Sequence, residues 1–416
     1  MTHKGLLWQK DAPIIRRVDE NDVYKILMMY LIWKYYPNLH VSFGFKNRTI
    51  DVPLAQYIDI GELAEQIGET ATLRFTDKVI GIYRSWDMFP EDFLQYLKGL
   101  QLNQPTISIQ NGILSIETCG NWLEDTLWEI YILAIVSELA SRGRAKHDGL
   151  TEAALWREGN ERLSEKIALF NAHPDLRIAQ FGLRRRFSGL WEDHVTNRLV
   201  TKCRGVITGV SNMYLADKYK LPAQGTNAHE LPMALTALAR HTSDQAMRDA
   251  PYVVLKLWQK LFGYKSLIML DDAYGSDVFH KHLQRKYLED FKGFRHDSGD
   301  PFAYGEAGIA LYNSHGIDPR NKLIIFSDGL NPRKAIALME HFRGRIMVAF
   351  GMGTNLTNDF ASLKALSLVM KIISAAGNPA VKLSNNLNKA TGPTDEIEYY
   401  MKVFGYTNTA SEAVVY

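Results

Sequence analysis

The residues best suited to chemistry lie in seven short turns between residues 181 and 354. Each turn follows a short apolar run and precedes a helical stretch, which marks the end of a strand and the start of a helix. In a βα barrel the carboxyl ends of all strands share one face, and that face carries the active site. The seven turns are residues 181–186, 208–212, 225–230, 271–275, 295–300, 327–331 and 350–354.

Two late turns are suited to binding phosphate. Gly329 and Gly353 each follow a strand, where backbone N–H groups approach an anion without a side chain in the way, and Thr354 adds a hydroxyl donor. The phosphate site of many barrels lies at the loops after the last strands. The alternative is that these glycines only permit tight strand-to-helix turns.

The turn at residues 295–300 combines a cation with carboxylates. The planar guanidinium of Arg295 fits a diphosphate, and Asp297 fits sugar hydroxyls or Mg²⁺. An internal Arg–Asp pair that holds the loop is the second interpretation. Asp271 and Asp272 end the preceding strand, where their charge would stabilise a developing sugar cation and anchor magnesium. We therefore count Asp272 among the substrate-binding candidates.

Two further turns carry a histidine and an aromatic ring. His229 precedes the carboxylate Glu230, which could orient its ring, so it is suited to act as an acid, a base or a nucleophile. Glu230 is alternatively an ordinary first-turn residue favoured by the helix dipole. Phe181 stands close to three consecutive arginines that begin at Arg184, and this combination fits a flat anionic ring. The alternative is a core phenylalanine followed by solvated arginines.

The pattern around these turns predicts an α/β fold in two parts. Residues 1–175 mix helices with alternating strands and include a hairpin that turns at Asn111 and Gly112, which predicts an α+β domain. Residues 176–384 alternate apolar runs with helices and predict an incomplete βα barrel of seven strands, although a doubly wound sheet gives the same alternation. Residues 385–416 are expected to rejoin the first domain. The strand candidates are residues 176–181, 205–208, 223–226, 267–271, 293–297, 322–327 and 346–350.

Composition excludes several classes of protein. The 416 residues are 46% hydrophobic, enough for a large core, and 48 basic against 46 acidic residues leave a net charge of +2, which argues against a nucleic-acid partner. The N-terminus has no signal-peptide pattern and no apolar run approaches ~18 residues, so we expect a cytoplasmic protein with no membrane partner. Cys119 and Cys203 form neither a metal motif nor a disulfide framework, and both are predicted to be buried.

Together these motifs resemble the nicotinate phosphoribosyltransferase family. The resemblance implies a type II phosphoribosyltransferase that works as a homodimer with shared active sites. It implies transfer of phosphoribosyl from phosphoribosyl pyrophosphate to nicotinate, the first step of NAD salvage from nicotinate, with Mg²⁺ as cofactor. It also implies that ATP is a co-substrate, hydrolysed in a ligase-like coupling. The matching segments, in order along the chain, are residues 22–25, 45–48, 181–188, 209–212, 225–230, 294–301 and 350–354.

The resemblance also implies roles for the catalytic and phosphate-binding residues. His229 matches the family's phosphorylated histidine, and Arg295 and Asp297 match the residues that hold the diphosphate and the ribose. No protein nucleophile needs to touch the sugar, because the pyridine nitrogen attacks the anomeric carbon as pyrophosphate leaves. The residues that match the 5′-phosphate loops are Gly329, Gly353 and Thr354.

The pyridine subsite implied by the resemblance has two aromatic residues and an arginine. Phe181 matches one ring-stacking residue, and Tyr24 matches another, which in relatives reaches in from the partner subunit. Ser211 stands where nicotinamide-using relatives carry an acid, so a serine near Arg184 fits a carboxylate substrate.

Three alternatives remain at this point. A nicotinamide- or quinolinate-specific transferase shares the fold and the type of reaction. A non-catalytic metabolite-binding paralogue would have no need to keep His229, Arg295 and Asp297 together. Without the resemblance, another phosphate-handling barrel enzyme such as an aldolase would fit, but that class needs a Schiff-base lysine at a strand end, and none of the seven turns supplies one.

Overall fold

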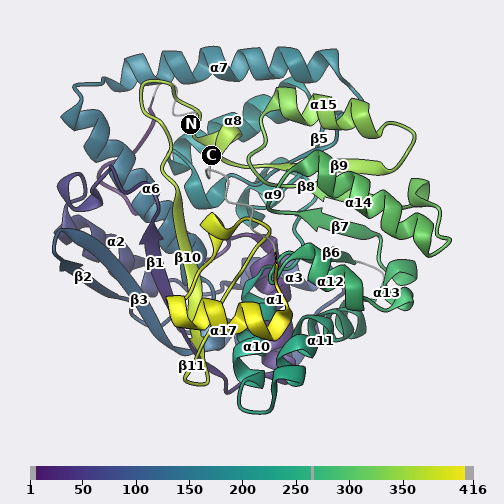
Figure 1. Ribbon diagram of the computed structural model, residues 1–416. Helices are drawn as coiled ribbons and strands as arrows, with labels where there is room; N and C mark the ends of the chain where they lie inside the picture. The colour runs from purple at the N-terminus through teal and green to yellow at the C-terminus, as the bar shows by residue number, and fades with distance from the viewer. Residues whose placement is uncertain (1–5, 264–266, 408–416) are drawn as a thin grey trace.

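The protein folds around two β-sheets, which lie side by side with helices packed around them (Figure 1). The structure is a computed structural model that describes residues 6–263 and 267–407. One sheet has five antiparallel strands and the other has six parallel strands. The chain therefore has the mixed α/β fold predicted from the two sequence patterns.

The antiparallel sheet comes mainly from the first third of the chain. Its strand order is β11-β10-β1-β3-β2. The predicted hairpin is confirmed, because β2 and β3 are joined by Asn111 and Gly112, whose φ angles of 52° and 77° suit a two-residue turn. The strands are β1 (His40–Asn47), β2 (Thr106–Gln110), β3 (Ile113–Asn121), β10 (Leu368–Ala375) and β11 (Asn378–Pro379). The helices of this region are α1 (Val23–Tyr35), α2 (Ile60–Ala71), α3 (Asp77–Arg84), α4 (Glu91–Gly99), α5 (Trp122–Asp125), α6 (Trp128–His147) and α7 (Glu152–Ala172).

The burial pattern of β3 corrects one prediction. Alternate residues of this strand face the core, and Thr118 takes the inward position. Cys119 is therefore exposed, whereas Cys203 is buried as predicted.

The parallel sheet has the strand order β5-β4-β9-β8-β7-β6. The first strand pairs with the last, which matches the cyclic order of a βα barrel better than a doubly wound sheet. The strands are β4 (Ile178–Gln180), β5 (Ile207–Val210), β6 (Ile268–Leu270), β7 (Gly293–His296), β8 (Leu323–Phe326) and β9 (Met347–Met352). The helices between and after them are α8 (Gly189–Lys202), α9 (Met213–Tyr219), α10 (Glu230–Ala239), α11 (Asp244–Phe262), α12 (Ser276–His282), α13 (Arg285–Asp290), α14 (Pro301–Ser314), α15 (Pro332–Phe342) and α16 (Thr354–Thr357).

The strand predicted at residues 223–226 does not form a full member of this sheet. It is reduced to one parallel bridge between Ala223 and Val210. Pro222, immediately before it, has no N–H to donate to a ladder, and Gly225 has no side chain to pack on the sheet. Among the residues that the structure describes, the sheet therefore has six strands and a bridge where seven strands were expected.

The chain returns to the antiparallel sheet at β10, which pairs with β1 and precedes residue 385, the predicted point of return. Helices α6 and α10 both pack on β10. The last helix, α17 (Thr394–Phe404), packs against α11, and the ring of Phe404 stacks on Tyr274 at 3.9 Å. Within the described residues, no helix combines the length and the apolar character needed to cross a membrane.

Pairing of β7 with β8 requires glycine at position 293. A Cβ atom there would lie 1.7 Å from the carbonyl oxygen of Leu323, a backbone atom of the paired strand. We expect Gly293→Ala to lower the free energy of unfolding by about 3 kcal/mol, the upper end for overpacking, measured by denaturant titration. The matched control is Gly81→Ala in α3, where no atom lies within 4 Å. Equal stability of the two variants would contradict this account.

Candidate active site

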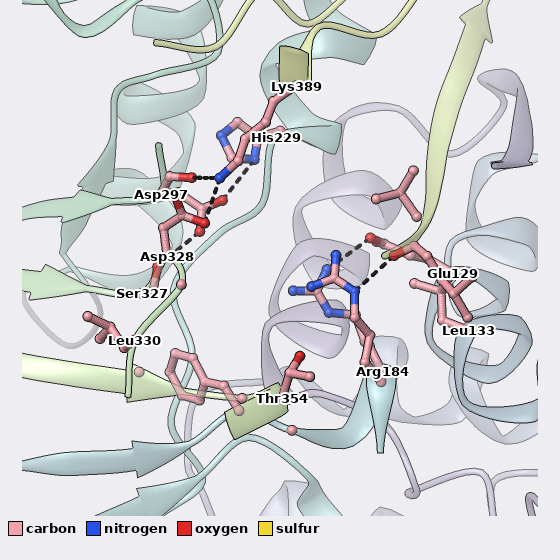
Figure 2. A pocket seen from close by; sticks show the side chains of 18 of the residues that line it. Glu129, Leu133, Arg184, His229, Asp297, Ser327, Asp328, Leu330, Thr354 and Lys389 are labelled. Atoms are coloured by element: carbon pink, nitrogen blue, oxygen red, sulfur yellow. Dashed lines mark hydrogen bonds and ion pairs between the residues drawn. The ribbon is translucent and has the colours of Figure 1, made fainter. Parts of the chain in front are cut away.

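One cavity lies where the carboxyl ends of the parallel strands face the antiparallel sheet (Figure 2). The turns after β4, β7, β8 and β9 form one side, and α6 and β10 form the other. Eight of the eleven predicted site residues line this single cavity. They are Phe181, Arg184, His229, Arg295, Asp297, Gly329, Gly353 and Thr354.

His229 is held by a carboxylate behind it. It immediately precedes α10, and its Nε2 lies 2.6 Å from Asp272 Oδ1. Its other nitrogen, Nδ1, lies 3.7 Å from Asp297 Oδ2, beyond hydrogen-bonding distance. Asp272 also accepts a hydrogen bond from Ser298 Oγ at 2.6 Å and lies 3.3 Å from Lys382 Nζ.

These contacts decide the protonation of the histidine. Burial disfavours the imidazolium and lowers the pKa of His229 below its usual value, with Lys382 acting in the same direction. Burial would raise the pKa of Asp272, but His229, Lys382 and Ser298 bring it well below its usual range. An ionised carboxylate can only accept, so the neutral ring carries its proton on Nε2. The lone pair on Nδ1 is then available on the cavity side.

Arg295 and Asp297 form a second rigid pair. Arg295 donates to Asp297 Oδ1 at 3.1 Å, to Ser327 Oγ at 2.9 Å and to Thr226 Oγ1 at 2.9 Å. Burial opposes ionisation of Asp297, but Arg295 and His229 lower its pKa below the usual value. Both interpretations made from the sequence therefore apply, because the pair holds its loop and also faces the cavity.

Glycines shape the side of the cavity that phosphate was predicted to occupy. Gly329 has a φ of 55°, in the left-handed region that glycine adopts most readily. A Cβ atom on Gly351 would lie 2.5 Å from the ring of Phe181, so this glycine leaves room for the ring at the cavity wall. Gly353 also lies close to Phe181, because a Cβ atom there would lie 2.9 Å from its carbonyl oxygen.

Arg184 lies across the cavity from His229 (Figure 2). Its Nη1 is 3.2 Å from Glu129 Oε1, and the same oxygen lies 3.1 Å from Lys371 Nζ. Its Nε is 3.9 Å from Asp22 Oδ2. The guanidinium is therefore oriented by carboxylates from α6 and from the residue before α1, with 30% of its side chain exposed.

Three predicted residues lie outside the wall of the cavity. Asp272 stands behind His229. Ser211 is buried, and its hydroxyl donates to Asp22 Oδ1 at 2.6 Å, so it reaches Arg184 only through that carboxylate. Tyr24 is 7% exposed within its own chain. Tyr24 packs beside Gly225 in its own chain, and its entry into a partner's site stays a prediction of the resemblance.

The predictions omit several charged residues that line the cavity. Arg48 and Lys371 come from the antiparallel sheet and its edge, and Lys382 and Lys389 from the segment that follows β11. Lys389 Nζ lies 2.5 Å from Asp328 Oδ1 and 3.2 Å from the carbonyl oxygen of Asp297 (Figure 2). Arg48 belongs to the matching segment 45–48. For Lys382 and Lys389 the sequence signal was their position on either side of a run that contains serine and three asparagines, outside the βα pattern.

The carboxylates of the cavity fit the magnesium ion that the resemblance implies. Within the described residues no group of three or more potential ligand side chains is placed to hold a metal by itself. Mg²⁺ commonly binds through one or two carboxylates together with substrate phosphates. Asp297 and Asp328 would fill that role, because both carboxylates line the cavity, and Lys389 Nζ contacts both Asp328 Oδ1 and the carbonyl oxygen of Asp297.

Comparison with known proteins identifies the family. Residues 20–137 match the model of the nicotinate phosphoribosyltransferase N-terminal domain, and residues 176–408 match the model of the nicotinate phosphoribosyltransferase family. The chain belongs to this family. Among solved structures it resembles nicotinate phosphoribosyltransferase from Porphyromonas gingivalis, with 32% identity over 94% of this chain and 100% of that one, at a TM-score of 0.84.

Two further members of the nicotinate phosphoribosyltransferase family have similar structures. The enzyme from Vibrio cholerae is 30% identical over 96% of this chain and 95% of that one, with a TM-score of 0.86. A putative nicotinate phosphoribosyltransferase from Saccharomyces cerevisiae is 26% identical over 96% of this chain and 100% of that one, with a TM-score of 0.84. The similarity thus extends over both sheets and the cavity between them.

The geometry predicts one tautomer for the histidine of this family member. With ¹⁵N-labelled histidine, long-range ¹H–¹⁵N spectra should show His229 neutral at pH 6.5 with its proton on Nε2, because burial depresses its pKa. Asp272→Asn removes the charge that favours protonation, so it should lower the pKa further and admit the Nδ1–H tautomer. A doubly protonated ring at pH 7 would contradict the assignment.

Proposed function

We propose that this protein transfers phosphoribosyl from phosphoribosyl pyrophosphate to nicotinate, forming nicotinate mononucleotide and pyrophosphate. The observation that supports this most directly is the convergence of predicted residues on one cavity. Glycine turns, an Arg–Asp pair, a histidine with a free Nδ1 and an aromatic ring beside an arginine all line it. The glycine turns, the Arg–Asp pair and the aromatic ring with its arginine correspond to parts of the two substrates, and the histidine corresponds to ATP.

The charge of the cavity suits a substrate with several phosphates. Its described lining has seven basic residues and three acidic ones, apart from His229. Such an excess concentrates anions and neutralises their charge. The basic residues are Arg48, Arg184, Arg185, Arg295, Lys371, Lys382 and Lys389, and the acidic ones are Glu129, Asp297 and Asp328.

The pyridine ring would stack on Phe181 with its carboxylate toward Arg184. Both side chains belong to the turn after β4 and line the same cavity. A guanidinium binds a carboxylate through two parallel hydrogen bonds, which an amide cannot reproduce. This supports a preference for nicotinate over nicotinamide.

Transfer would then depend on positioning and charge. The pyridine nitrogen forms a bond to the anomeric carbon as the bond to pyrophosphate breaks, and pyrophosphate keeps the electron pair. Arg295 would hold the diphosphate, and Asp297 would bind the ribose hydroxyls and face the developing positive charge on the sugar. The turns at Gly329 and Gly353 would hold the 5′-phosphate. Bound Mg²⁺ supplies further neutralisation of the leaving diphosphate.

ATP would act through His229. The lone pair on Nδ1 attacks the terminal phosphorus, ADP leaves, and Asp272 stabilises the ring through its Nε2 proton. Later hydrolysis of the phosphohistidine releases phosphate and makes the overall transfer more favourable. Helix α10, which starts immediately after His229, also favours negative charge at this position.

A homodimer is part of the same proposal. Because Tyr24 is buried in its own chain, it is a poor candidate for a residue shared across the dimer. A shared site would then need to draw on other residues of the partner.

Removing the proposed nucleophile should separate the two activities. We expect His229→Ala to reduce ATP hydrolysis at least about 1000-fold, as for loss of an essential nucleophile, while slow ATP-independent transfer remains. Pyrophosphate and phosphate release, assayed with and without ATP, measure the two activities. His147→Ala, at an exposed histidine outside the cavity, is the control. Retained ATP coupling in His229→Ala would refute the role.

Substrate preference should depend on Arg184. We expect the wild-type protein to favour nicotinate over nicotinamide and quinolinate in kcat/KM by at least about 100-fold, and Arg184→Gln to lose most of that preference, since a charge-assisted pair contributes about 2–3 kcal/mol. Pyrophosphate release with each pyridine measures it. Arg320→Gln, at an exposed arginine paired with Asp318, is the control. A wild-type preference for another pyridine would reject nicotinate as the substrate.

A further inference from the structure

A fully buried lysine lies between two glutamates beneath the cavity. Lys25 in α1 has no solvent exposure, and its Nζ lies 2.8 Å from Glu129 Oε2 and 2.5 Å from Glu230 Oε2. Burial opposes its charge, but the two carboxylates raise the pKa of Lys25 above its usual value. The lysine is therefore a charged bridge between two carboxylates that come from different helices.

One end of this bridge meets the proposed pyridine subsite. Glu129 uses one oxygen for Lys25 and the other for Arg184 and Lys371, both of which line the cavity. Burial would raise the pKa of Glu129, but these three cations bring it well below the usual range. A substrate carboxylate on Arg184 would compete with Glu129 for the guanidinium and leave Glu129 more dependent on Lys25.

The other end meets the proposed phosphohistidine. Glu230 is the first residue of α10 and follows His229 directly. Its carboxylate also accepts hydrogen bonds from Trp122 Nε1 at 2.6 Å and from Thr126 Oγ1 at 2.7 Å. The start of α10, and with it the backbone of His229, is therefore anchored through the same carboxylate that holds Lys25.

We propose that the bridge Glu129–Lys25–Glu230 couples occupancy of Arg184 by a substrate carboxylate to phosphorylation of His229. Lys25 pairs one ammonium with two carboxylates. A change in the strength of its ion pair with one glutamate therefore alters the ion pair with the other. Lys25 acts as a positioning residue that touches neither substrate. This inference rests on the proposed function, because it needs nicotinate at Arg184 and ATP at His229.

Coupling between two ligands is measured as the ratio of the affinities for one ligand in the presence and absence of the other. A variant that changes the affinity equally in both conditions leaves this ratio unchanged. We would measure the dissociation constant of labelled nicotinate by equilibrium dialysis, without PRPP, in the presence and absence of Mg·ATP with a regenerating system. For the wild-type protein we expect ATP to tighten nicotinate binding at least about fivefold. Glu129→Gln changes the subsite itself in both conditions, so that effect cancels in the ratio.

Glu230→Gln removes the charge of the glutamate that does not contact Arg184, the proposed nicotinate-binding residue. Its amide oxygen can still accept from Trp122 and Thr126, so we expect this variant to fold even if Glu129→Gln does not. Both variants should reduce the ratio below about twofold, well under the roughly fivefold lower end of typical coupling. The matched control is Glu20→Gln, which neutralises an equally buried glutamate paired with Arg186 outside the cavity, and it should keep the wild-type ratio.

The outcomes distinguish this inference from the proposed function. A wild-type protein that neither binds nicotinate nor transfers phosphoribosyl refutes the proposed function. A wild-type protein that is active but has a ratio near one, or a Glu230→Gln variant that keeps the full ratio, overturns the bridge alone. An equal loss in Glu20→Gln also overturns it, since a general loss of stability would then explain the effect.

Discussion

The site depends on the buried carboxylate of Asp272. It stands at the end of β6 and holds three separate parts of the chain: His229 at the start of α10, Ser298 in the turn after β7, and Lys382 beyond β11. A buried charge is stable only when it is paired and hydrogen-bonded, so these partners are constrained to stay in place. The same constraint orients the histidine and leaves Nδ1 on the cavity side.

Charge balance extends this arrangement across the cavity. The cations that would bind phosphate and carboxylate groups are each close to a carboxylate that offsets their mutual repulsion. These carboxylates are Asp297, Asp328 and Glu129. These contacts hold long side chains in fixed positions before a ligand arrives, which reduces the entropy lost on binding. The antiparallel sheet also contributes to this balance, since Glu129 and Lys371 come from elements that pack with it or belong to it.

Local sequence patterns predicted the elements well where one physical cause dominates. Asn111 and Gly112 predicted their hairpin because few residues adopt positive φ at two successive positions. The strand predicted at residues 223–226 is reduced to one bridge. Apolar periodicity does not include the effect of Pro222 and Gly225 on strand pairing.

By itself, the sequence determined which side chains gather at the strand ends, because parallel strands must present their carboxyl ends on one face. It did not determine which groups lie behind them. Ser211 reaches Arg184 only through Asp22, and Lys25 contacts Glu129 and Glu230, both of which lie more than a hundred residues away in the chain. Such pairings arise from the packing of distant segments, and periodicity over a few residues carries no information about them.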